Sequence, residues 1–405
     1  MTITENQDRD EVVISAPVFA PYAQQGSKLV GTGYIGNSMQ GVVAVSADGN
    51  TAVVGGSNDN MGTGALWVFT RTSGVWSQQG NKLTGSDCVG ASGLGTSVAI
   101  SADGNTVIAG GSGDNNSIGA AWIFTRSNGA WSQQGNKIVG SNYVLSSMQG
   151  ASVGMSADGN TVAIGGNGDG GAVGAVWIFN RSERVWSQVG NKLVGTGFEG
   201  KANQGSSLAL SADGKTLIVG SVLETTVSAP IWVFVNSSGW QQQGNYLTAS
   251  GAIVDKYGQN TTVSVSADGN SFVLGENQDN DQTGAFWIFT RTDGTWSQQS
   301  GKLVGSGASG KAAQGCSVSM SDDGQTVVVG GDTDNGNQGA VWVFQNNGGA
   351  WLQCGEKLVG TNAGGAAYQG NSVALSGDGR TILSGGFNDD SLVGASWVFA
   401  AQFIH

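Results

Sequence analysis

The chain has 405 residues and a formal net charge of −12, with 17 Lys and Arg against 29 Asp and Glu. This balance disfavours nucleic acid and anionic membranes as partners, because phosphate groups are bound by clustered basic side chains. With 39% hydrophobic residues, including 13 Trp, the chain has enough apolar surface to form a core, and 70 Gly indicate many tight turns.

The first elements along the chain are a tail and a short strand. Residues 1–15 read as a polar N-terminal tail without the apolar core of a secretory signal. No run of 18 apolar residues follows, so we expect no membrane insertion. The compartment stays open: cytoplasmic synthesis followed by non-classical export or association with a particle fits this pattern. The three Cys residues suggest no disulfide framework.

From about residue 40 onward the chain repeats itself every 55 residues. An Asp-Gly pair and a Trp followed by Val-Phe or Ile-Phe mark each unit. The Asp of the pair is Asp48, Asp103, Asp158, Asp213, Asp268, Asp323 and Asp378. The Trp is Trp67, Trp122, Trp177, Trp232, Trp287, Trp342 and Trp397. A fixed period of this length indicates a repeat architecture.

Each unit predicts four strands, as the second unit shows. Residues 97–101 alternate small and large side chains, and the Asp103-Gly104 pair predicts a hairpin into residues 106–109. Residues 120–125 are apolar on both faces, which is typical of a strand between two neighbouring sheets. A second turn leads to a fourth strand at residues 131–135. Four strands repeated seven times are typical of a propeller.

The last unit lacks its fourth strand, and the start of the chain supplies a match. Residues 22–29 (YAQQGSKL) align with residues 131–138 (WSQQGNKI), and Tyr22 takes the place of Trp131. We therefore predict one all-β domain over residues 16–403: a seven-bladed β-propeller with four antiparallel strands per blade, closed by the N-terminal strand. Closure removes the open sheet edges that promote aggregation.

The unit resembles the FG-GAP repeat in its bacterial form, the blade motif also found in integrin α-subunit propellers. The matching residues are Gln314-Gly315-Cys316-Ser317-Val318, Asp323-Gly324-Gln325-Thr326 and Val329-Gly330-Gly331. The resemblance implies the propeller fold. Gln replaces the Phe of Phe-Gly in six units, and the calcium loop of integrin repeats is absent, so calcium binding of that kind is not implied.

Nothing in the sequence points to catalysis or to a cofactor. His405 is the only His, and three scattered Cys offer neither a nucleophile pair nor metal spacing. We therefore expect no enzymatic activity and assign no metal site. Hydrolysis by a pair of carboxylates assembled from distant loops stays open as an alternative. Residues 332–336 (DTDNG) resemble the start of a calcium loop, but the Gly comes one position early and Val343 stands in place of the bidentate Glu. Calcium binding stays open.

The candidate site is the propeller face that holds the interblade links and the loops between second and third strands. Loops on a rigid scaffold commonly carry binding function. Its candidate ligand-binding residues are Asp59, Asp114, Asp169, Asp279, Asp334, Asp389, Tyr34, Tyr143, Phe198 and Tyr368. The alternative is that these carboxylates are solvated turn formers and that the aromatic residues fill gaps between blades. One interpretation of the repeated Trp residues is that they stack on sugars. The alternative is that they are buried between blades.

The sequence thus predicts a non-catalytic recognition module that binds glycans or a protein surface multivalently through this face, since several equivalent weak sites give avidity. The alternative is a structural or assembly protein, such as a coat or particle component, without a small-molecule ligand. In isolation we expect a monomer.

Overall fold

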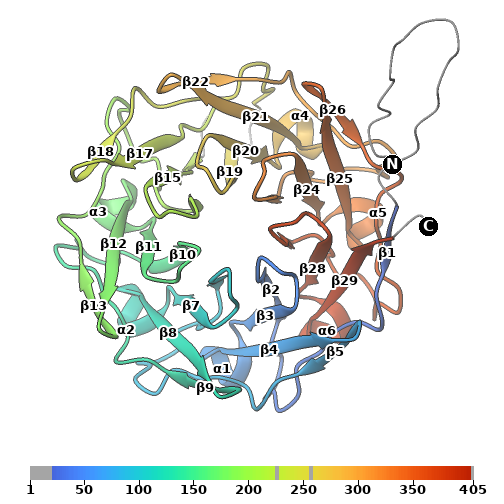
Figure 1. The fold of residues 1–405 in the computed structure, drawn as a ribbon, viewed down its shortest axis with the longest axis horizontal. Coiled ribbons are helices and arrows are strands. Elements are labelled where there is room, and N and C mark those ends of the chain that lie inside the picture. Colours follow the sequence, from blue (N-terminus) through green and yellow to red (C-terminus); the bar gives the residue numbers. More distant parts are fainter. Residues whose placement is uncertain (1–20, 224–227, 255–258, 403–405) are drawn as a thin grey trace, which may run out of the picture.

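The computed structural model describes residues 21–223, 228–254 and 259–402. Within these residues, seven antiparallel sheets surround a central axis like the blades of a propeller (Figure 1). The predicted all-β, seven-bladed fold is confirmed. The predicted tail, residues 1–15, lies outside the described residues.

Blades 1 to 3 have four strands each, in chain order from the axis outward. Blade 1 consists of β2 (Gln40–Val45), β3 (Thr51–Gly56), β4 (Ala65–Thr72) and β5 (Val75–Gln78). Blade 2 consists of β6 (Ser97–Ile100), β7 (Thr106–Gly111), β8 (Ala120–Ser127) and β9 (Ala130–Gln133). Blade 3 consists of β10 (Gln149–Met155), β11 (Thr161–Gly166), β12 (Ala175–Ser182) and β13 (Val185–Gln188).

Blades 4 and 5 depart from this pattern. Blade 4 consists of β14 (Leu208–Leu210), β15 (Thr216–Val219), β17 (Trp232–Asn236) and β18 (Trp240–Gln242). Blade 5 consists of β19 (Gln259–Val265), β20 (Ser271–Glu276), β21 (Ala285–Thr292) and β22 (Thr295–Gln298). The short strand β16 (Val222–Leu223) follows the second strand of blade 4 but pairs with β19, so it adds a fifth strand to blade 5.

Blades 6 and 7 return to the regular pattern. Blade 6 consists of β23 (Ser317–Met320), β24 (Thr326–Gly331), β25 (Ala340–Asn347) and β26 (Ala350–Gln353). Blade 7 consists of β27 (Ser372–Leu375), β28 (Thr381–Gly386), β29 (Ala395–Ala401) and, from the other end of the chain, β1 (Tyr22–Gln24).

A single helical turn joins the second and third strands of six blades; in blade 4 this connection includes residues 224–227, which lie outside the described residues. These turns are α1 (Asp59–Gly62), α2 (Asp114–Ser117), α3 (Asp169–Ala172), α4 (Asp279–Gln282), α5 (Asp334–Asn337) and α6 (Asp389–Leu392). They are not regular helices, because their two central residues have left-handed backbone angles, such as φ 50° at Asn60 and 58° at Met61. The sequence pattern did not predict them.

Closure of the ring follows the prediction. Tyr22 of β1 pairs with Ala401 of β29, and the Tyr22 hydroxyl donates a 2.5 Å hydrogen bond to the carbonyl of Gly379 in blade 7. Around the axis, the backbone N–H of one blade donates to the carbonyl of the next, through Ala47, Ala102, Ala157, Ala212, Ala267, Asp322 and Gly377, and back to Ala47. This circle of bonds joins all seven blades.

The core lies between adjacent blades. The seven third-strand Trp residues are all fully buried, which confirms that they form interblade core. Each indole N–H also donates to a backbone or side-chain oxygen of the link beside it; Trp177, for example, donates to the Ser141 carbonyl at 2.7 Å. Gly140 packs flat on the same ring, where a Cβ atom would lie 2.1 Å from Cδ1 of Trp177. Each Trp therefore fixes the path of one link.

Candidate functional site

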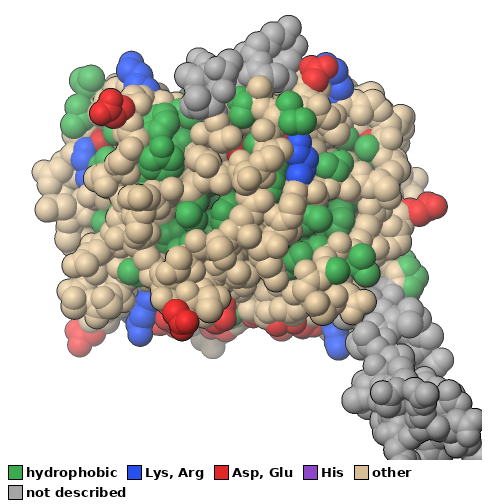
Figure 2. All heavy atoms as spheres, turned by 90° about the horizontal axis from the view of Figure 1, so that it is seen from above, with side chains coloured by type: hydrophobic (Ala, Val, Ile, Leu, Met, Phe, Trp, Pro, Cys, Tyr) green, Lys and Arg blue, Asp and Glu red, His purple; other side chains and the backbone are tan. Residues whose placement is uncertain are grey.

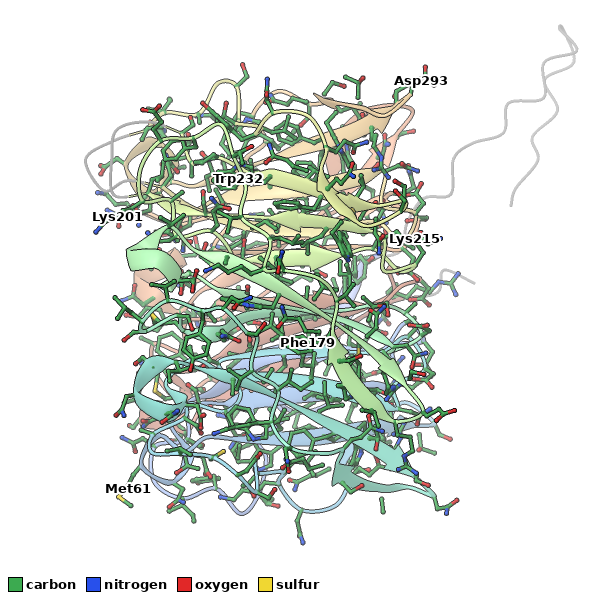
Figure 3. All side chains as sticks on the ribbon, turned by 90° about the vertical axis from the view of Figure 1, so that its left-hand side faces the viewer. Met61, Phe179, Lys201, Lys215, Trp232 and Asp293 are labelled. Atoms are coloured by element: carbon green, nitrogen blue, oxygen red, sulfur yellow. The ribbon has the colours of Figure 1, made fainter. Side chains whose placement is uncertain are left out.

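The propeller has two unlike faces. The links between blades and the helical turns form one face, here called the link rim, while the hairpin turns form the other, the hairpin rim. Figure 3 shows Met61 and Lys201 on the link rim and Lys215 and Asp293 on the hairpin rim. Acidic side chains gather along the hairpin rim, the lower edge in Figure 2, whereas the outer wall carries few charges.

The six candidate aspartates each begin a helical turn on the link rim. The Asp59 carboxylate accepts a 2.7 Å hydrogen bond from the N–H of Ile35 through one oxygen and binds the Lys82 ammonium at 2.5 Å through the other. Asp114, Asp169, Asp279, Asp334 and Asp389 repeat this arrangement with Lys137, Lys192, Lys302, Lys357 and Lys28. All six aspartates are at most 2% exposed.

These carboxylates therefore point into the protein rather than toward solvent. Each one clamps a helical turn to the neighbouring link and neutralises a lysine, so both oxygens already have strong partners. The geometry supports a structural role for them. A ligand would have to break the ion pair to reach the carboxylate, and ligand binding by these six residues stays an untested prediction.

The four candidate aromatic residues divide into two kinds. Tyr34 and Tyr143 are 41% and 39% exposed and stand on the links that precede blades 1 and 3. Phe198 instead packs edge-on against Trp232 and Tyr246, with ring centroids 6.5 and 6.0 Å away. Tyr368 is half-buried, 5.1 Å from the ring of Phe387. The rim thus presents two open tyrosines, while Phe198 fills a gap.

Blade 4 has Glu224 at the position of the aspartate, outside the described residues, and it lacks the lysine. Tyr246 occupies the lysine position, and its ring lies 6.3 Å from that of Trp232. The rings of Phe198, Trp232 and Tyr246 pack together beside the place that the lysine has in the other blades.

Most exposed apolar side chains of the link rim lie on one part of it, whereas Ile253, 51% exposed on the link before blade 5, lies outside that part. We define the apolar sector as the exposed residues Tyr34, Ile35, Met61, Val89, Tyr143, Val144, Leu145 and Met148. Met61 is 90% exposed and Leu145 77%, which is unusual for such large apolar side chains. The sequence reasoning missed this sector, because exposure depends on how the links lie on the rim.

The links and helical turns that carry the apolar sector are joined by backbone hydrogen bonds. At α1, the N–H of Asn60 donates to the Ile35 carbonyl, and the Gly62 carbonyl accepts from the N–H of Gly93. At α2, the N–H of Asn115 donates to the Val89 carbonyl, and the Ser117 carbonyl accepts from the N–H of Met148. Each step connects a link to the helical turn beside it. The side chains of the sector therefore stand on one connected backbone surface.

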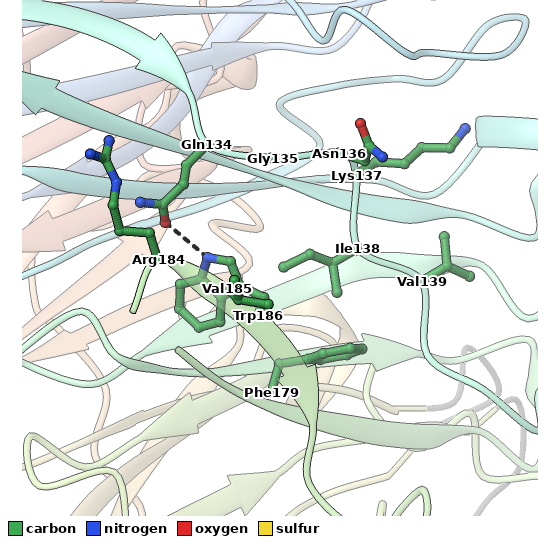
Figure 4. A pocket seen from close by; sticks show the side chains of 10 residues that line it. All are labelled: Gln134, Gly135, Asn136, Lys137, Ile138, Val139, Phe179, Arg184, Val185 and Trp186. Carbon is green, nitrogen blue, oxygen red and sulfur yellow. Dashed lines mark hydrogen bonds between the residues drawn. The ribbon is translucent and has the colours of Figure 1, made fainter. Parts of the chain in front are cut away.

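A hollow of about 380 Å³ lies on the outer wall between blades 2 and 3 (Figure 4). Ile138, Val139, Phe179 and the half-buried Trp186 form its apolar lining, and Trp186 donates a 3.0 Å hydrogen bond to the side chain of Gln134. Similar Trp–Gln pairs recur in four other blades at Trp76, Trp131, Trp296 and Trp351. Arg71, Arg126, Arg181 and Arg291 lie over four of these indole rings, about 5 Å from their centroids.

The axial opening at the hairpin rim carries one charged residue. Its lining has Ala or Gly at six of the seven equivalent positions and Asp322 at the seventh. Burial, followed by the nearby charges of Asp323 and Asp378, raises the pKa of Asp322. Gly377 makes room for this carboxylate, since a Cβ atom there would lie 2.2 Å from it.

The loop that resembles a calcium loop is held by protein groups. Asp334 is paired with Lys357, and Asp332 accepts a 2.9 Å hydrogen bond from Asn371. In the part of the chain that the structure describes, no three His, Cys, Asp or Glu residues are grouped so that they could hold a metal ion. The three cysteines are free thiols. Among the same residues, no helix is long and apolar enough to cross a membrane.

Comparison with known proteins finds no matching family model and no matching curated protein. The FG-GAP resemblance is therefore not shown at the level of a family; what the structure supports is the seven-bladed propeller. One solved structure with a similar fold is the periplasmic gluconolactonase PpgL of Pseudomonas aeruginosa. It is 17% identical, with 79% of this chain and 86% of that chain covered and a TM-score of 0.49.

This finding corrects one expectation from the sequence. The lack of a histidine relay and of a metal motif led us to expect no enzymatic activity, yet the propeller found in the comparison is named as an enzyme. Catalytic residues in a propeller can come from loops of several blades, so a missing sequence motif does not exclude them. The expectation that the chain is not an enzyme is withdrawn. The similarity is too low to assign a reaction to this chain.

Proposed function

We propose that the chain is a recognition module that binds a protein surface through the apolar sector of the link rim. The observation that carries this proposal is the exposure of Met61 and Leu145 beside two open tyrosines. Large exposed apolar patches on soluble proteins commonly mark interaction sites, and Tyr and Met are enriched in protein interfaces.

The charge distribution supports a protein partner with an apolar, uncharged face. The links before blades 1 and 3, residues 32–39 and 141–148, contain no charged residue, and the link before blade 2 contains only Asp87. Beyond the sector the rim carries exposed charges, such as Asp281 and Lys311. Charged residues are depleted at the centre of protein interfaces.

The sector also breaks the sevenfold repetition of the rim. The residue that donates its N–H to the buried aspartate is apolar at Ile35, Val89, Val144 and Ile253, but it is Ser309 and Gly364 in blades 6 and 7. A single partner that covers three adjacent blades fits this distribution better than seven equal sites. Under this proposal, one partner contacts several neighbouring blades within a single interface, in place of separate equal sites on all seven blades.

Site-specific photo-crosslinking in the native host tests the proposal. A photoreactive phenylalanine analogue at position 61 or 145 is expected to give one and the same protein adduct. The same analogue at position 75, where Val75 is 69% exposed on the hairpin rim, serves as the matched control and is expected to give none. Equal adducts from both rims, or none from either, would contradict the proposal. An adduct with a second copy of this chain would instead favour the assembly alternative.

Glycan binding at the outer-wall hollow is a second candidate. The hollow combines the indole of Trp186 with the polar side chains of Gln134, Asn136 and Arg184, and aromatic faces with adjacent hydrogen-bonding groups suit sugars. A glycan array, with and without calcium, separates the two candidates. Binding that is retained when Leu145 is changed to Ser but lost when Trp186 is changed to Ala would support a glycan site. Failure to bind any sugar would remove this candidate.

A further inference from the structure

The repeat is broken most strongly where blade 4 meets blade 5, in the region of β19 and β20 in Figure 1. The second strand of five blades ends in glycine, at Gly56, Gly111, Gly166, Gly331 and Gly386, whereas in blade 5 it ends in Glu276. Asn260 likewise replaces a glycine that has a left-handed backbone in five of the other six blades, such as Gly150 with φ 86°. As a result β19 stays extended and pairs with β16 of the preceding repeat.

The carboxylate of Glu276 is buried without a partner. Its side chain is 0% exposed, and neither oxygen has a hydrogen-bond partner. Thr261 lies directly opposite Glu276 on the paired strand, and Gln259 lies two residues before Thr261, so the three side chains project from the same face of the sheet. Thr261 exchanges two hydrogen bonds with the backbone of Ser221, so this face meets blade 4.

Other polar atoms at the same junction also lack partners. Gln259 is 1% exposed and makes no hydrogen bond through its amide, although the equivalent Gln in five blades bonds twice to the link backbone, as Gln40 does with Gly31. The hydroxyl groups of Ser207 in blade 4 and Thr261 both lie beside Gly220. A Cβ atom on Gly220 would be 2.3 Å from the Ser207 hydroxyl oxygen and 2.7 Å from the Thr261 hydroxyl oxygen.

These atoms account for most of the unsatisfied polar groups in the described residues. Nine buried side-chain polar atoms have no hydrogen-bond partner, and six of them belong to Ser206, Ser207, Gln259 and Glu276 in blades 4 and 5. Five of these six are oxygen atoms. A buried polar group without a partner is costly, and such groups in native proteins commonly indicate an ordered water molecule or ion.

We propose that the junction between blades 4 and 5 binds a hard metal cation such as Ca²⁺, with the Glu276 carboxylate as the charged ligand and neighbouring amide and hydroxyl oxygens as neutral ligands. An excess of oxygen acceptors around one buried negative charge is the donor set that hard cations prefer. A bound cation would join β20 of blade 5 to blade 4 at the joint where the regular glycine packing is lost. No other blade has this combination among its described residues.

Thermal unfolding of the chelator-treated full chain tests the proposal, with Ca²⁺, Mg²⁺ or Na⁺ added at pH 8. We expect Ca²⁺ to raise the unfolding midpoint in a saturable way. Glu276→Gln and Glu276→Gly are both expected to abolish the shift; the second variant restores the glycine of the other blades and guards against misfolding of the first. Asp281→Asn, which removes an exposed carboxylate from α4, is the matched control and should retain the shift.

Terbium luminescence gives a second readout that does not depend on stability. In the regular blades, the last residue of the second strand lies against the ring of the third-strand Trp. A Cβ atom on Gly166, for example, would be 2.8 Å from Trp177. Terbium at the junction is therefore expected to emit on excitation of Trp287, and Glu276→Gln should remove this signal. The proposal is overturned if no cation shifts the midpoint, or if Glu276→Gln responds as the unchanged chain does. A pH effect of Glu276 without any cation effect would likewise show a buried acid and no site.

Discussion

At the scale of single residues, the buried aspartates hold each link in place. Asp114 binds the ammonium of Lys137 and the N–H of Val89 simultaneously, and its side chain is 1% exposed. Removing a carboxylate of this kind leaves a partly buried lysine and an N–H group without partners. Such a change is costly, because the surviving charge has lost its compensation.

We expect Asp114→Asn to lower the free energy of unfolding by about 3 kcal/mol, the size typical of breaking a buried ion pair. Asp281→Asn is the control, since the Asp281–Lys311 pair is more than half exposed on both sides. It should change the stability by no more than about 1 kcal/mol. Chemical denaturation of both variants makes the comparison. Equal losses in the two variants would show that burial of the pair is unimportant.

The constant spacing of these pairs was visible in the sequence. A lysine follows the aspartate by 23 residues in five blades, as Lys137 follows Asp114, and blade 4 lacks both residues. That correlation signals a contact and was missed. The exposure of Met61 and the burial of Glu276 could not be predicted in the same way, because both depend on the path that the links take. Residue type and repeat period do not determine that path.

At the scale of elements, the fit between a link glycine and a third-strand Trp sets the geometry of each junction. Gly140 leaves no space for a side chain above Trp177. At the junction before blade 5, Ala249 takes the equivalent place, so the link must adjust there. The strand pattern, the Trp core and the closing strand could all be predicted from the repeat, whereas this local adjustment could not.

Gly140→Ala is expected to lower the free energy of unfolding by at least about 2 kcal/mol, because the new methyl group overpacks the indole ring. Ala249→Gly is the counterpart and should cost about 1 kcal/mol, mainly through the greater backbone freedom of glycine in the unfolded chain. Thermal or chemical unfolding distinguishes the two. If Gly140→Ala were as well tolerated as Ala249→Gly, the Trp would not constrain the link.

At the scale of the whole molecule, two sets of carboxyl groups make stability depend on pH in opposite directions. Burial raises the pKa of Asp103, but hydrogen bonds from Ser101 and Asn105 outweigh it and hold the pKa below the usual value. The stabilisation from such groups is lost as the pH falls through the folded pKa. Glu276, whose pKa is raised to about 8, favours the folded state when protonated, and this contribution is lost as the pH rises toward 8.

We therefore expect the unfolding midpoint of the cation-free chain to be highest at about pH 4–5 and to fall on both sides. Glu276→Gln should flatten the decline between about pH 5 and 8 while the decline in acid remains. Differential scanning fluorimetry across this pH range, with chelator present, provides the measurement. An alkaline decline that persists unchanged in Glu276→Gln would assign it to other groups.

The link rim and the junction between blades 4 and 5 both depend on a ring of blades that the N-terminal strand closes. β1 completes blade 7 through its pairing with β29, and Lys28 and Leu29 make the ion pair and the backbone bonds found at the equivalent place in the other blades. Without these residues, blade 7 would expose a strand edge and the buried side chains of its outer face. Burial of Tyr22 and Leu29 alone is worth about 3 kcal/mol or more.

The most direct measurement is the thermal unfolding of a chain that lacks residues 1–30, compared with one that lacks residues 1–20 and keeps β1. The longer deletion is expected to lose cooperative unfolding or to unfold at a much lower temperature, and to aggregate through its open edge. The shorter deletion should unfold as the full chain does. If the chain without residues 1–30 unfolded cooperatively at the temperature of the full chain, closure by the N-terminal strand would be contradicted.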